Sequence, residues 1–330
     1  SELLLDAGIS TLEMNVAQID GGGNNKVFSV TTISGKYLVK FYYRNTSDTR
    51  NRLNAEYSFI EYARKIGINC VPELIFSNPE KGIGLFEYVE GRKLASDELS
   101  PQHISQAAKF VRNLNEGIIG DNALPMASEA CFSIEQHFLL LDMRIKRLLS
   151  LSVISKIDRQ ALLFINKLEK ILKNIKDDIA DRCDSISLQI NAADRCISPS
   201  DFGFHNALIK DNDEIVFIDF EYAGWDDPAK MVGDFFSQPS IPVSFKHFDR
   251  FTSEALAYSK NSEELVQRAR LLLPLFEIKW CCIMLNDFLP DSARRRQFAN
   301  PTLEPLQRKR QQLEKAQRFL YSRIGQKWHI

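Results

Sequence analysis

Three polar residues in the middle of the chain stand beside short apolar runs, at a spacing that restricts the fold. Asp201 is followed by Asn206 and, further along, by Asp219. Residues 207–209 and 215–218 have the apolar character of two short strands, and the polar residues between them are typical of a turn. Such a hairpin holds Asn206 at the start of one strand and Asp219 at the end of the other. We therefore expect both side chains at the same end of the hairpin, with Asp201 on the loop just before it.

This set of one carboxamide and two carboxylates suits phosphoryl transfer from a nucleotide. One carboxylate orients or deprotonates the attacking hydroxyl group, while an amide and a second carboxylate hold magnesium against the phosphates. Each residue also has an ordinary explanation, because Asp and Asn are common in turns and at strand ends. Their joint occurrence beside two predicted strands favours the chemical interpretation over the ordinary one.

Residues 197–234 resemble the aminoglycoside phosphotransferase and choline kinase branch of the protein-kinase-like fold. That branch usually carries H-G-D-x-x-x-x-N followed by I-D-F or I-D-W, and this chain keeps both aspartates and the asparagine. Pro199 and Ser200 replace the histidine and the glycine. The replaced histidine does not transfer the phosphoryl group, so its absence concerns the anchoring of the loop. The resemblance is strong over 197–234 and looser over 19–94.

The resemblance implies an α+β, two-lobed protein-kinase-like fold. A small N-terminal lobe is built on an antiparallel sheet, and a larger C-terminal lobe is mainly helical. ATP and Mg²⁺ are the implied cofactors, and Asp201 is the implied catalytic residue. Asn206 and Asp219 are the implied magnesium ligands, and Glu221, in the sequence D-F-E, is a candidate ligand of a second magnesium ion. His205 fits loop packing or the acceptor side better than metal binding, because magnesium prefers oxygen ligands.

Three consecutive glycines, Gly21, Gly22 and Gly23, lie between two predicted strands near the N-terminus. A strand-to-strand turn of this kind lets the backbone approach phosphate groups closely. The match to the kinase pattern G-x-G-x-x-G is partial, since Lys26 stands at the third glycine position, and no Walker A loop is present. A flexible hairpin turn is the alternative. Lys40 on the third predicted strand favours the phosphate-binding interpretation.

Lys40 lies in an apolar run, where an unpaired ammonium group is costly, and so it needs an anionic partner. The following helix, predicted for residues 48–65, carries Glu56 beside its apolar face. By the resemblance, Lys40 contacts the α- and β-phosphates of the nucleotide and Glu56 holds Lys40 in place. The alternative is that Lys40 is a charge on an edge strand and Glu56 a solvated helix residue.

Two further predicted strands, 71–76 and 83–89, complete the small sheet. Residues 87–91, at the end of the second of these strands, resemble the hinge between the two lobes. In the resembled family, backbone groups of this hinge read the edge of the purine, which makes Tyr88 and Val89 candidates for contact with adenine. A plain strand end followed by a loop is the alternative.

We place the boundary between the lobes near Gly91. Residues 1–91 then form the nucleotide-binding lobe with its hinge, and residues 92–330 form the helical lobe with the catalytic loop, the metal site and the acceptor pocket. Asp234 resembles the acid that braces the catalytic loop. Apolar periodicity predicts three helices in the first half of the larger lobe, at 101–115, 134–149 and 157–179.

The composition gives no support to several classes of function. The 330 residues carry a formal net charge of −1, which gives no support to nucleic-acid binding. No signal peptide opens the chain and no uninterrupted apolar run reaches the length of a membrane span, so we expect no membrane partner. The six cysteines show neither C-x-x-C nor zinc spacing, and we expect reduced thiols in a cytoplasmic protein. The sequence leaves the oligomeric state open.

The predicted function is ATP- and Mg²⁺-dependent transfer of the γ-phosphoryl group to a hydroxyl of a small molecule, such as an aminoglycoside, a sugar or an amino alcohol such as choline. A helix start is predicted soon after Asp219, at Asp227 and Pro228, and no A-P-E motif follows. Little chain is therefore left for the peptide platform of a protein kinase. The alternative is a non-catalytic nucleotide-binding or scaffold protein of the same fold, and a kinase acting on a lipid or protein hydroxyl is a further one.

Overall fold

The computed structural model describes residues 2–19, 24–44, 48, 50–117, 124–299 and 304–323. The chain forms two compact units. The first unit comprises residues 1–128, 197–225 and 295–301, and the second comprises residues 129–196, 226–294 and 302–330. The lobe boundary that the sequence places near Gly91 stays a prediction.

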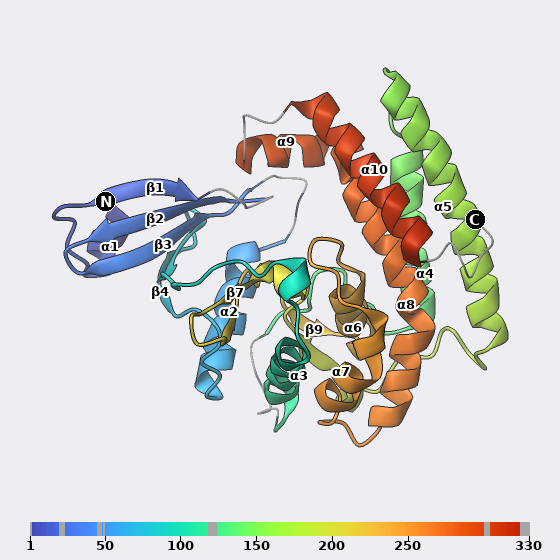
Figure 1. Cartoon of the computed structure of the whole chain (residues 1–330), viewed down its shortest axis with the longest axis horizontal. Coiled ribbons are helices and arrows are strands. Elements are labelled where there is room, and N and C mark those ends of the chain that lie inside the picture. Colours follow the sequence, from blue (N-terminus) through green and yellow to red (C-terminus); the bar gives the residue numbers. More distant parts are fainter. Residues whose placement is uncertain are drawn as a thin grey trace. The chain divides into compact units, whose positions relative to one another are not determined.

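An antiparallel five-stranded sheet forms the N-terminal part of the first unit, in the strand order β1-β2-β3-β5-β4 (Figure 1). This sheet confirms the predicted N-terminal architecture. Its strands are β1 (Asn15–Ile19), β2 (Lys26–Thr32), β3 (Gly35–Phe41), β4 (Leu74–Asn78) and β5 (Ile83–Glu87). With the short helix α1 (Glu2–Asp6), the sheet buries a small apolar core made of Leu4, Val30, Val39 and Leu85. Strand β3 pairs on both sides, so Lys40 lies on an interior strand and not at an edge.

Helix α2 (Arg52–Lys65) follows the third strand and begins later than the sequence predicts. The side chain of Asn51 caps it by accepting a hydrogen bond from the backbone N–H of Asn54 at 3.1 Å. Asp48, the predicted start, lies outside the helix, and its carboxylate accepts hydrogen bonds from the backbone and the side chain of Arg50. Helix α2 buries its apolar face within the first unit through Leu53, Phe59, Ile60 and Ala63.

The rest of the first unit consists of helix α3 (Pro101–Asn115) and a hairpin of β7 (Ala207–Ile209) and β8 (Ile215–Phe217). Both agree with the elements predicted from the sequence. Ser100 caps α3 and Pro101 occupies its first position, where a missing N–H costs nothing. The hairpin pairs Ala207 with Phe217 and Ile209 with Ile215. Three short 3₁₀ turns or strands flank it: η1 (Ser96–Glu98), η3 (Phe204–Asn206) and β6 (Cys196–Ser198).

A cluster of aromatic rings inside the first unit connects its helices to the loops around the hairpin. Phe110 of α3 stacks on Phe217 at 4.6 Å between ring centroids, and Phe202 lies 5.3 Å from Phe217. Phe220 packs on Phe59 of α2 at 4.5 Å. All five rings are buried. They fix the loops that carry Asp201 and Asp219 by packing, at centroid distances typical of favourable aromatic pairs.

The second unit is a helical assembly around α8 (Ser262–Met284), which packs against α4, α5, α6 and α10 (Figure 1). These neighbours are α4 (Ile134–Leu149), α5 (Lys156–Asp181), α6 (Pro228–Ser237) and α10 (Pro305–Arg323). Ser133 and Ser155 cap α4 and α5, so the predicted helix pair is confirmed with bounds that differ by two residues or fewer. The mainly helical character of the C-terminal part is confirmed as well.

The remaining elements are short or terminal. They are η2 (Ala192–Asp194), β9 (Gly224–Asp226), η4 (Phe245–His247), α7 (Phe248–Ala255), η5 (Leu285–Phe288) and α9 (Pro290–Ala299). Asp227 caps α6 through the N–H of Ala229, with Pro228 at the first helical position, as the sequence predicts. None of the helices that the structure describes combines the length and the hydropathy of a membrane span.

Candidate active site

Lys40 is buried in the first unit between two carboxylates. Its Nζ donates a hydrogen bond to Oε2 of Glu56 at 2.7 Å and another to Oδ1 of Asp219 at 2.5 Å. The side chain is only 7% exposed, and that of Glu56 is 5% exposed. The two acids come from α2 and from the loop after β8, so one ammonium group joins three segments that are far apart in the sequence. The sequence anticipates Glu56 as a partner of Lys40 but does not anticipate the contact with Asp219.

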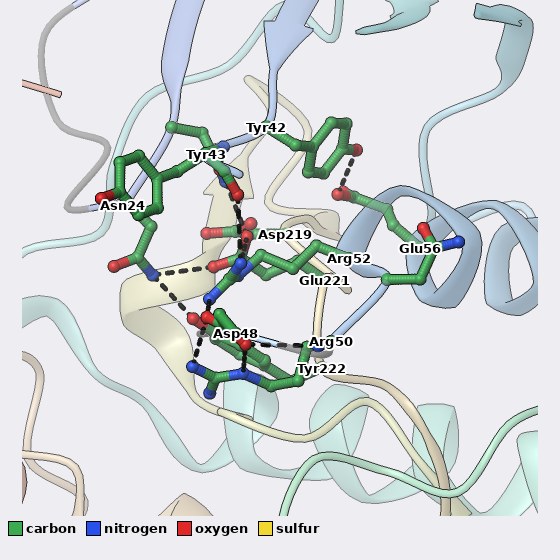
Figure 2. Close-up of polar contacts among 12 residues, drawn as sticks. Asn24, Tyr42, Tyr43, Asp48, Arg50, Arg52, Glu56, Asp219, Glu221 and Tyr222 are labelled. Atoms are coloured by element: carbon green, nitrogen blue, oxygen red, sulfur yellow. Dashed lines mark hydrogen bonds and ion pairs between the residues drawn. The ribbon is translucent and has the colours of Figure 1, made fainter. Parts of the chain in front are cut away.

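The carboxylate of Glu56 is fully engaged. Oε2 also accepts a hydrogen bond from the hydroxyl of Tyr42 at 2.6 Å, and Oε1 accepts one from the backbone N–H of Phe220 at 3.2 Å. Figure 2 shows the Tyr42 hydroxyl directed at Glu56. Glu56 therefore fixes both the ammonium group of Lys40 and the backbone that follows Asp219. Sequence reasoning missed Tyr42, and only its place one residue after β3 would have suggested it.

The charges in this group shift one another's protonation equilibria. Burial alone would lower the pKa of the Lys40 ammonium, but Asp219 and Glu56 outweigh burial and raise that pKa above its ordinary value. Burial would raise the pKa of the Asp219 carboxyl, yet Lys40 lowers it below the usual range. Burial, helped by the negative charge of Asp219, raises the pKa of Glu56. Lys40 and Asp219 therefore stay charged near neutral pH.

Asp201 lies on a loop with an unusual backbone. Ser200 and Asp201 both have φ of 48°, in the left-handed region that costs most non-glycine residues roughly 1 kcal/mol or more. Oδ1 of Asp201 lies 3.2 Å from Nε2 of His205, and its backbone carbonyl accepts a hydrogen bond from Nδ2 of Asn206 at 3.1 Å. The short helix η3 brings His205 and Asn206 back beside Asp201. The histidine contact was not foreseen, although the His-Asn pair next to the loop is visible in the sequence.

Two side chains anchor the loop that leads to Asp201. Asn115, at the end of α3, accepts a hydrogen bond from the N–H of Ile197 at 2.7 Å and donates one to its carbonyl at 3.1 Å. Oγ of Ser198 then accepts a hydrogen bond from the N–H of Ser200 at 3.0 Å. Asn115 and Ser198 are both buried. The loop is thus held by an amide and a hydroxyl.

Asn206 and Asp219 lie at the same end of the β7–β8 hairpin. The backbone N–H of Ile218 donates to the carbonyl of Asn206 at 2.9 Å, which ties the start of β7 to the end of β8. Asp219 has φ of 69°, so the chain turns sharply directly after the hairpin. Lys93 approaches from the segment after the sheet, and its Nζ donates to the carbonyl of His205 at 2.8 Å. Burial lowers the pKa of Lys93, against the attraction of Asp219. Lys93 is a second cation near the acids, which sequence reasoning missed.

The donor set at this end of the hairpin suits a hard divalent cation. One oxygen of Asp219 contacts Lys40, and the side-chain amide of Asn206 uses its nitrogen on Asp201. The second carboxylate oxygen of Asp219 and the side-chain oxygen of Asn206 are of the kind that Mg²⁺ prefers. Phosphate and water oxygens would complete its six ligands. In the described part of the chain, no group of three or more His, Cys, Asp or Glu side chains is arranged to hold a metal ion. A site with one carboxylate and one carboxamide from the protein is smaller than such a group.

The other predicted site residues occupy separate positions. Glu221 is buried, and its carboxylate accepts hydrogen bonds from Asn24 and Asn25 at the start of β2. Tyr88 and Val89 follow β5 and are half-buried, with Nζ of Lys36 3.7 Å above the centre of the Tyr88 ring. The predicted phosphate-binding glycines, Gly21, Gly22 and Gly23, lie outside the described residues.

The segment after Tyr88 and Val89 runs against the hairpin that leads to Asp219. Arg92 exchanges two backbone hydrogen bonds with Ile209 of β7, at 3.0 and 2.8 Å. Gly91 makes this approach possible, because a Cβ atom there would lie 3.0 Å from the carbonyl oxygen of Ile209. The backbone directly after the predicted hinge is therefore joined to strand β7 of the hairpin.

Comparison with known proteins gives a family and a fold. The sequence profile of a family described as "Phosphotransferase enzyme family" matches residues 15–236. A comparison with curated protein sequences gives no significant match.

Three solved structures illustrate the likeness in fold. A choline kinase from Cryptosporidium parvum Iowa II has 16% sequence identity and a TM-score of 0.56, with 94% of this chain and 90% of that chain covered. A choline kinase from Streptococcus pneumoniae has 16% identity and a TM-score of 0.57, with 97% and 99% covered. A spectinomycin phosphotransferase in complex with ADP and spectinomycin has 12% identity and a TM-score of 0.57, with 96% and 97% covered. At these identities the likeness concerns the fold.

Proposed function

Because this chain belongs to the phosphotransferase enzyme family, we propose that it transfers the γ-phosphoryl group of ATP to a hydroxyl group of a small molecule, with Mg²⁺ as the metal ion. The observation that carries this proposal is the contact of Lys40 with both Glu56 and Asp219, at 2.7 and 2.5 Å, beside Asp201 and Asn206. Phosphoryl transfer depends on such a set of fixed charges, because positioning and electrostatic stabilisation provide most of the catalysis.

In the proposed reaction, the chain's own residues hold the nucleotide and the acceptor. The ammonium group of Lys40 neutralises the α- and β-phosphates, and Glu56 keeps that group in place. Asn206 and Asp219 hold Mg²⁺, which when bound neutralises charge on the phosphate oxygens. The glycines Gly21, Gly22 and Gly23 cover the phosphates, and the backbone at Tyr88 and Val89 takes the adenine.

Asp201 is the proposed catalytic residue on the acceptor side. Its carboxylate accepts a hydrogen bond from the acceptor hydroxyl group and takes the proton late in the transfer. His205 Nε2, 3.2 Å from Oδ1, orients this carboxylate so that the other oxygen faces the acceptor. The hydroxyl oxygen forms a new bond to the γ-phosphorus while the bond from that phosphorus to the bridging oxygen of ADP breaks.

A small molecule is the proposed acceptor, rather than a protein. Helix α6 begins at Pro228, nine residues after Asp219, which leaves little chain for the peptide platform of a protein kinase. The similar structures that are described as choline kinases and as a spectinomycin phosphotransferase support an amino alcohol or an aminoglycoside as the acceptor class. A sugar hydroxyl belongs to the same proposal.

An acceptor panel tests the proposal. Release of ADP from ATP is followed with Mg²⁺ and a set of amino alcohols, aminoglycosides and sugars, each compared with the rate without acceptor. We expect at least one acceptor to raise the rate, and Asp201→Asn to abolish that increase while ATP binding is kept. Nucleotide binding without turnover on any acceptor would instead support the non-catalytic, scaffold alternative. Retained turnover in Asp201→Asn would reject the role assigned to Asp201.

A further inference from the structure

Glu221 has both of its carboxylate oxygens engaged by two neighbouring asparagines. Nδ2 of Asn24 donates to Oε1 at 2.7 Å, and Nδ2 of Asn25 donates to Oε2 at 2.7 Å. Figure 2 shows the Asn24 amide directed at Glu221 and Tyr222. The residue is only 2% exposed and Asn25 only 5%. A buried carboxylate whose two oxygens each accept a short hydrogen bond is satisfied within the protein.

The two asparagines are themselves fixed by other parts of the first unit. Nδ2 of Asn24 also donates to the hydroxyl of Tyr222 at 2.9 Å, and Oδ1 of Asn25 accepts a hydrogen bond from the backbone N–H of Tyr43 at 3.2 Å. Neither asparagine is therefore a loosely held surface residue. Their side chains bridge the start of β2, the end of β3 and the loop after β8.

Arg52 completes the surroundings of Glu221. Its Nε lies 3.6 Å from Oε2 of Glu221, and Nη1 donates to the carbonyl of Tyr43 at 3.2 Å. The carboxylate of Asp48 accepts a hydrogen bond from Nη2 of the same guanidinium at 2.5 Å. Glu221 thus sits opposite a buried cation that belongs to the chain, and its negative charge is compensated before any metal ion is bound.

This arrangement disfavours direct metal binding by Glu221. A magnesium ion there would have to share two buried oxygens that already accept hydrogen bonds from side-chain amides, and it would lie beside the positive charge of Arg52. The same arrangement suits a role in positioning neighbouring segments of the chain. Asn24 and Asn25 directly follow Gly21–Gly23, and Glu221 stands two residues after Asp219.

We propose that Glu221 is a positioning residue, which locks Asn24 and Asn25, directly before β2, to the loop that carries Asp219. The inference rests on the proposed function in one respect: Asp219, in the loop that is locked, is the proposed magnesium ligand. Glu221 then contributes to the nucleotide site by holding Asn24 and Asn25 beside the loop of Asp219. It affects catalysis through the position of these residues and not by binding the metal ion.

A polarity exchange distinguishes this role from metal binding. Glu221→Gln keeps one acceptor oxygen and places an NH2 group against one of the two asparagine amides, which breaks one of the two hydrogen bonds of the lock. Adding Asn25→Asp restores a pair of one carboxylate and one amide between positions 25 and 221, with the two groups exchanged. The new carboxylate at position 25 then accepts a hydrogen bond from the new amide at position 221 and still accepts the N–H of Tyr43. A positioning role predicts recovery in the double variant. A metal-ligand role predicts none, because position 221 still lacks its carboxylate.

Kinetics with varied ATP and varied Mg²⁺ provide the first readout. We expect Glu221→Gln to raise KM for ATP about tenfold, to change the half-saturating Mg²⁺ concentration less than about twofold, and the double variant to regain most of the loss. A shift of the Mg²⁺ requirement of about tenfold or more, with no recovery in the double variant, would overturn the proposal in favour of a metal ligand.

Thermal unfolding without nucleotide and with a chelator provides a readout that does not depend on the proposed function. Glu221→Gln should lower Tm by several degrees and the double variant should restore it, whereas a residue that serves only as a metal ligand would leave Tm unchanged or raise it. Asn24→Ala, which keeps Glu221, should lower Tm and raise KM in the same direction, and it covers the case in which Glu221→Gln does not fold. Absence of any effect of Asn24→Ala would contradict the lock even if the chain proves to be an ATP-dependent kinase.

Discussion

At the scale of single residues, Lys40 shows how one buried charge decides the arrangement around it. An ammonium group that is 7% exposed needs compensation, and the chain supplies two carboxylates within 2.7 Å. A nucleotide phosphate that approaches Lys40 competes with Asp219 for the same group, whereas Glu56 is held by Tyr42 and by the backbone of Phe220. We therefore expect Glu56 to remain the partner of Lys40 in the proposed nucleotide complex, and Asp219 to exchange with a phosphate group.

Glu56→Gln tests this division of roles. The variant removes the charge that fixes Lys40 on the α2 side, and Lys40 is then drawn to Asp219. We expect the Kd for Mg·ATP, measured by calorimetry, to rise about tenfold, which corresponds to about 1.4 kcal/mol. Tyr42→Phe is the matched control, because it removes one hydrogen bond to Glu56 and leaves the charge, and a change below about threefold is expected there. Equal affinity of Glu56→Gln and the unchanged chain would remove the assigned role of Glu56.

Asp219→Ala should separate metal binding from nucleotide binding. With Mg²⁺ present, the loss of a carboxylate ligand is expected to weaken ATP binding about a hundredfold. With a chelator present, ATP binding is expected to stay the same or to strengthen, because Lys40 loses a competing acid. Calorimetry in both conditions measures the difference, and Asp211→Ala, an exposed acid in the turn of the same hairpin, serves as the control. A similar loss with and without Mg²⁺ would show that Asp219 holds the fold and not the metal ion.

At the scale of elements, Gly233 sets how closely α6 packs on α8 in the second unit. A Cβ atom at position 233 would overlap the ring of Phe276. Alanine is favoured over glycine within a helix by about 1 kcal/mol, so propensity and packing act in opposite directions here. Overpacking a buried contact usually costs about 1–3 kcal/mol. We expect the cost of overpacking to exceed the gain in helix propensity, because Gly233 and Phe276 are both buried.

Gly233→Ala should therefore lower the free energy of unfolding, measured by denaturant titration, by about 1–2 kcal/mol. Phe276→Leu removes the ring that the new methyl group meets, and the double variant should lose less stability than the two single variants together. Additive losses, or a gain in stability from Gly233→Ala alone, would show that α6 can move away from α8 at little cost.

Elements with local signals were predicted well from the sequence. The β7–β8 hairpin follows from two apolar runs and a polar turn, and the start of α3 follows from Ser100 and Pro101. The sequence places the start of α2 too early, at Asp48, because the arginines that bind its carboxylate resemble ordinary helix residues in the sequence.

The candidate site was only partly within reach of the sequence. The spacing of Asp201, Asn206 and Asp219 is local and was recognised as a set. The contact of Lys40 with Asp219 and those of Glu221 with Asn24 and Asn25 join positions more than 170 residues apart. No periodicity or motif in one sequence encodes such pairs, since they depend on how loops meet in three dimensions.

At the scale of the whole molecule, the second unit contains a buried network of ion pairs. Asp226 lies 2.5 Å from Nζ of Lys230, which also lies 3.4 Å from Asp234, and Asp234 contacts Lys279 at 3.2 Å. All four residues are at most 6% exposed. Buried ion pairs stabilise little in net terms, but removing one partner leaves an uncompensated charge. Acids in this unit should therefore contribute to the pH dependence of stability.

Two of the buried acids in this unit act in opposite directions. Burial, opposed by Lys230, raises the pKa of Asp226 to about 6, so the folded chain holds this proton more tightly than the unfolded chain and Asp226 favours folding more as pH falls from 6 to 4. Burial would also raise the pKa of Glu129, but Arg144 outweighs it and lowers that pKa from 4.5 to about 2. Glu129 stabilises the fold above pH 4.5 and loses this effect as pH falls towards 2.

Glu129→Gln should show how much of the loss of stability at acid pH comes from this one carboxylate. The variant is expected to be less stable than the unchanged chain at about pH 6, by up to about 3 kcal/mol, since a shift of one pKa unit corresponds to about 1.4 kcal/mol. The difference should shrink steadily between pH 4.5 and 2, where the carboxyl of the unchanged chain takes up its proton and also loses its attraction to Arg144. Denaturant titrations at a series of pH values measure it. Asp226→Asn is the control with the opposite slope, because its stability relative to the unchanged chain should rise between about pH 4 and 6. A stability difference for Glu129→Gln that stays constant across the acid range would mean that Arg144 holds Glu129 through packing and not through charge.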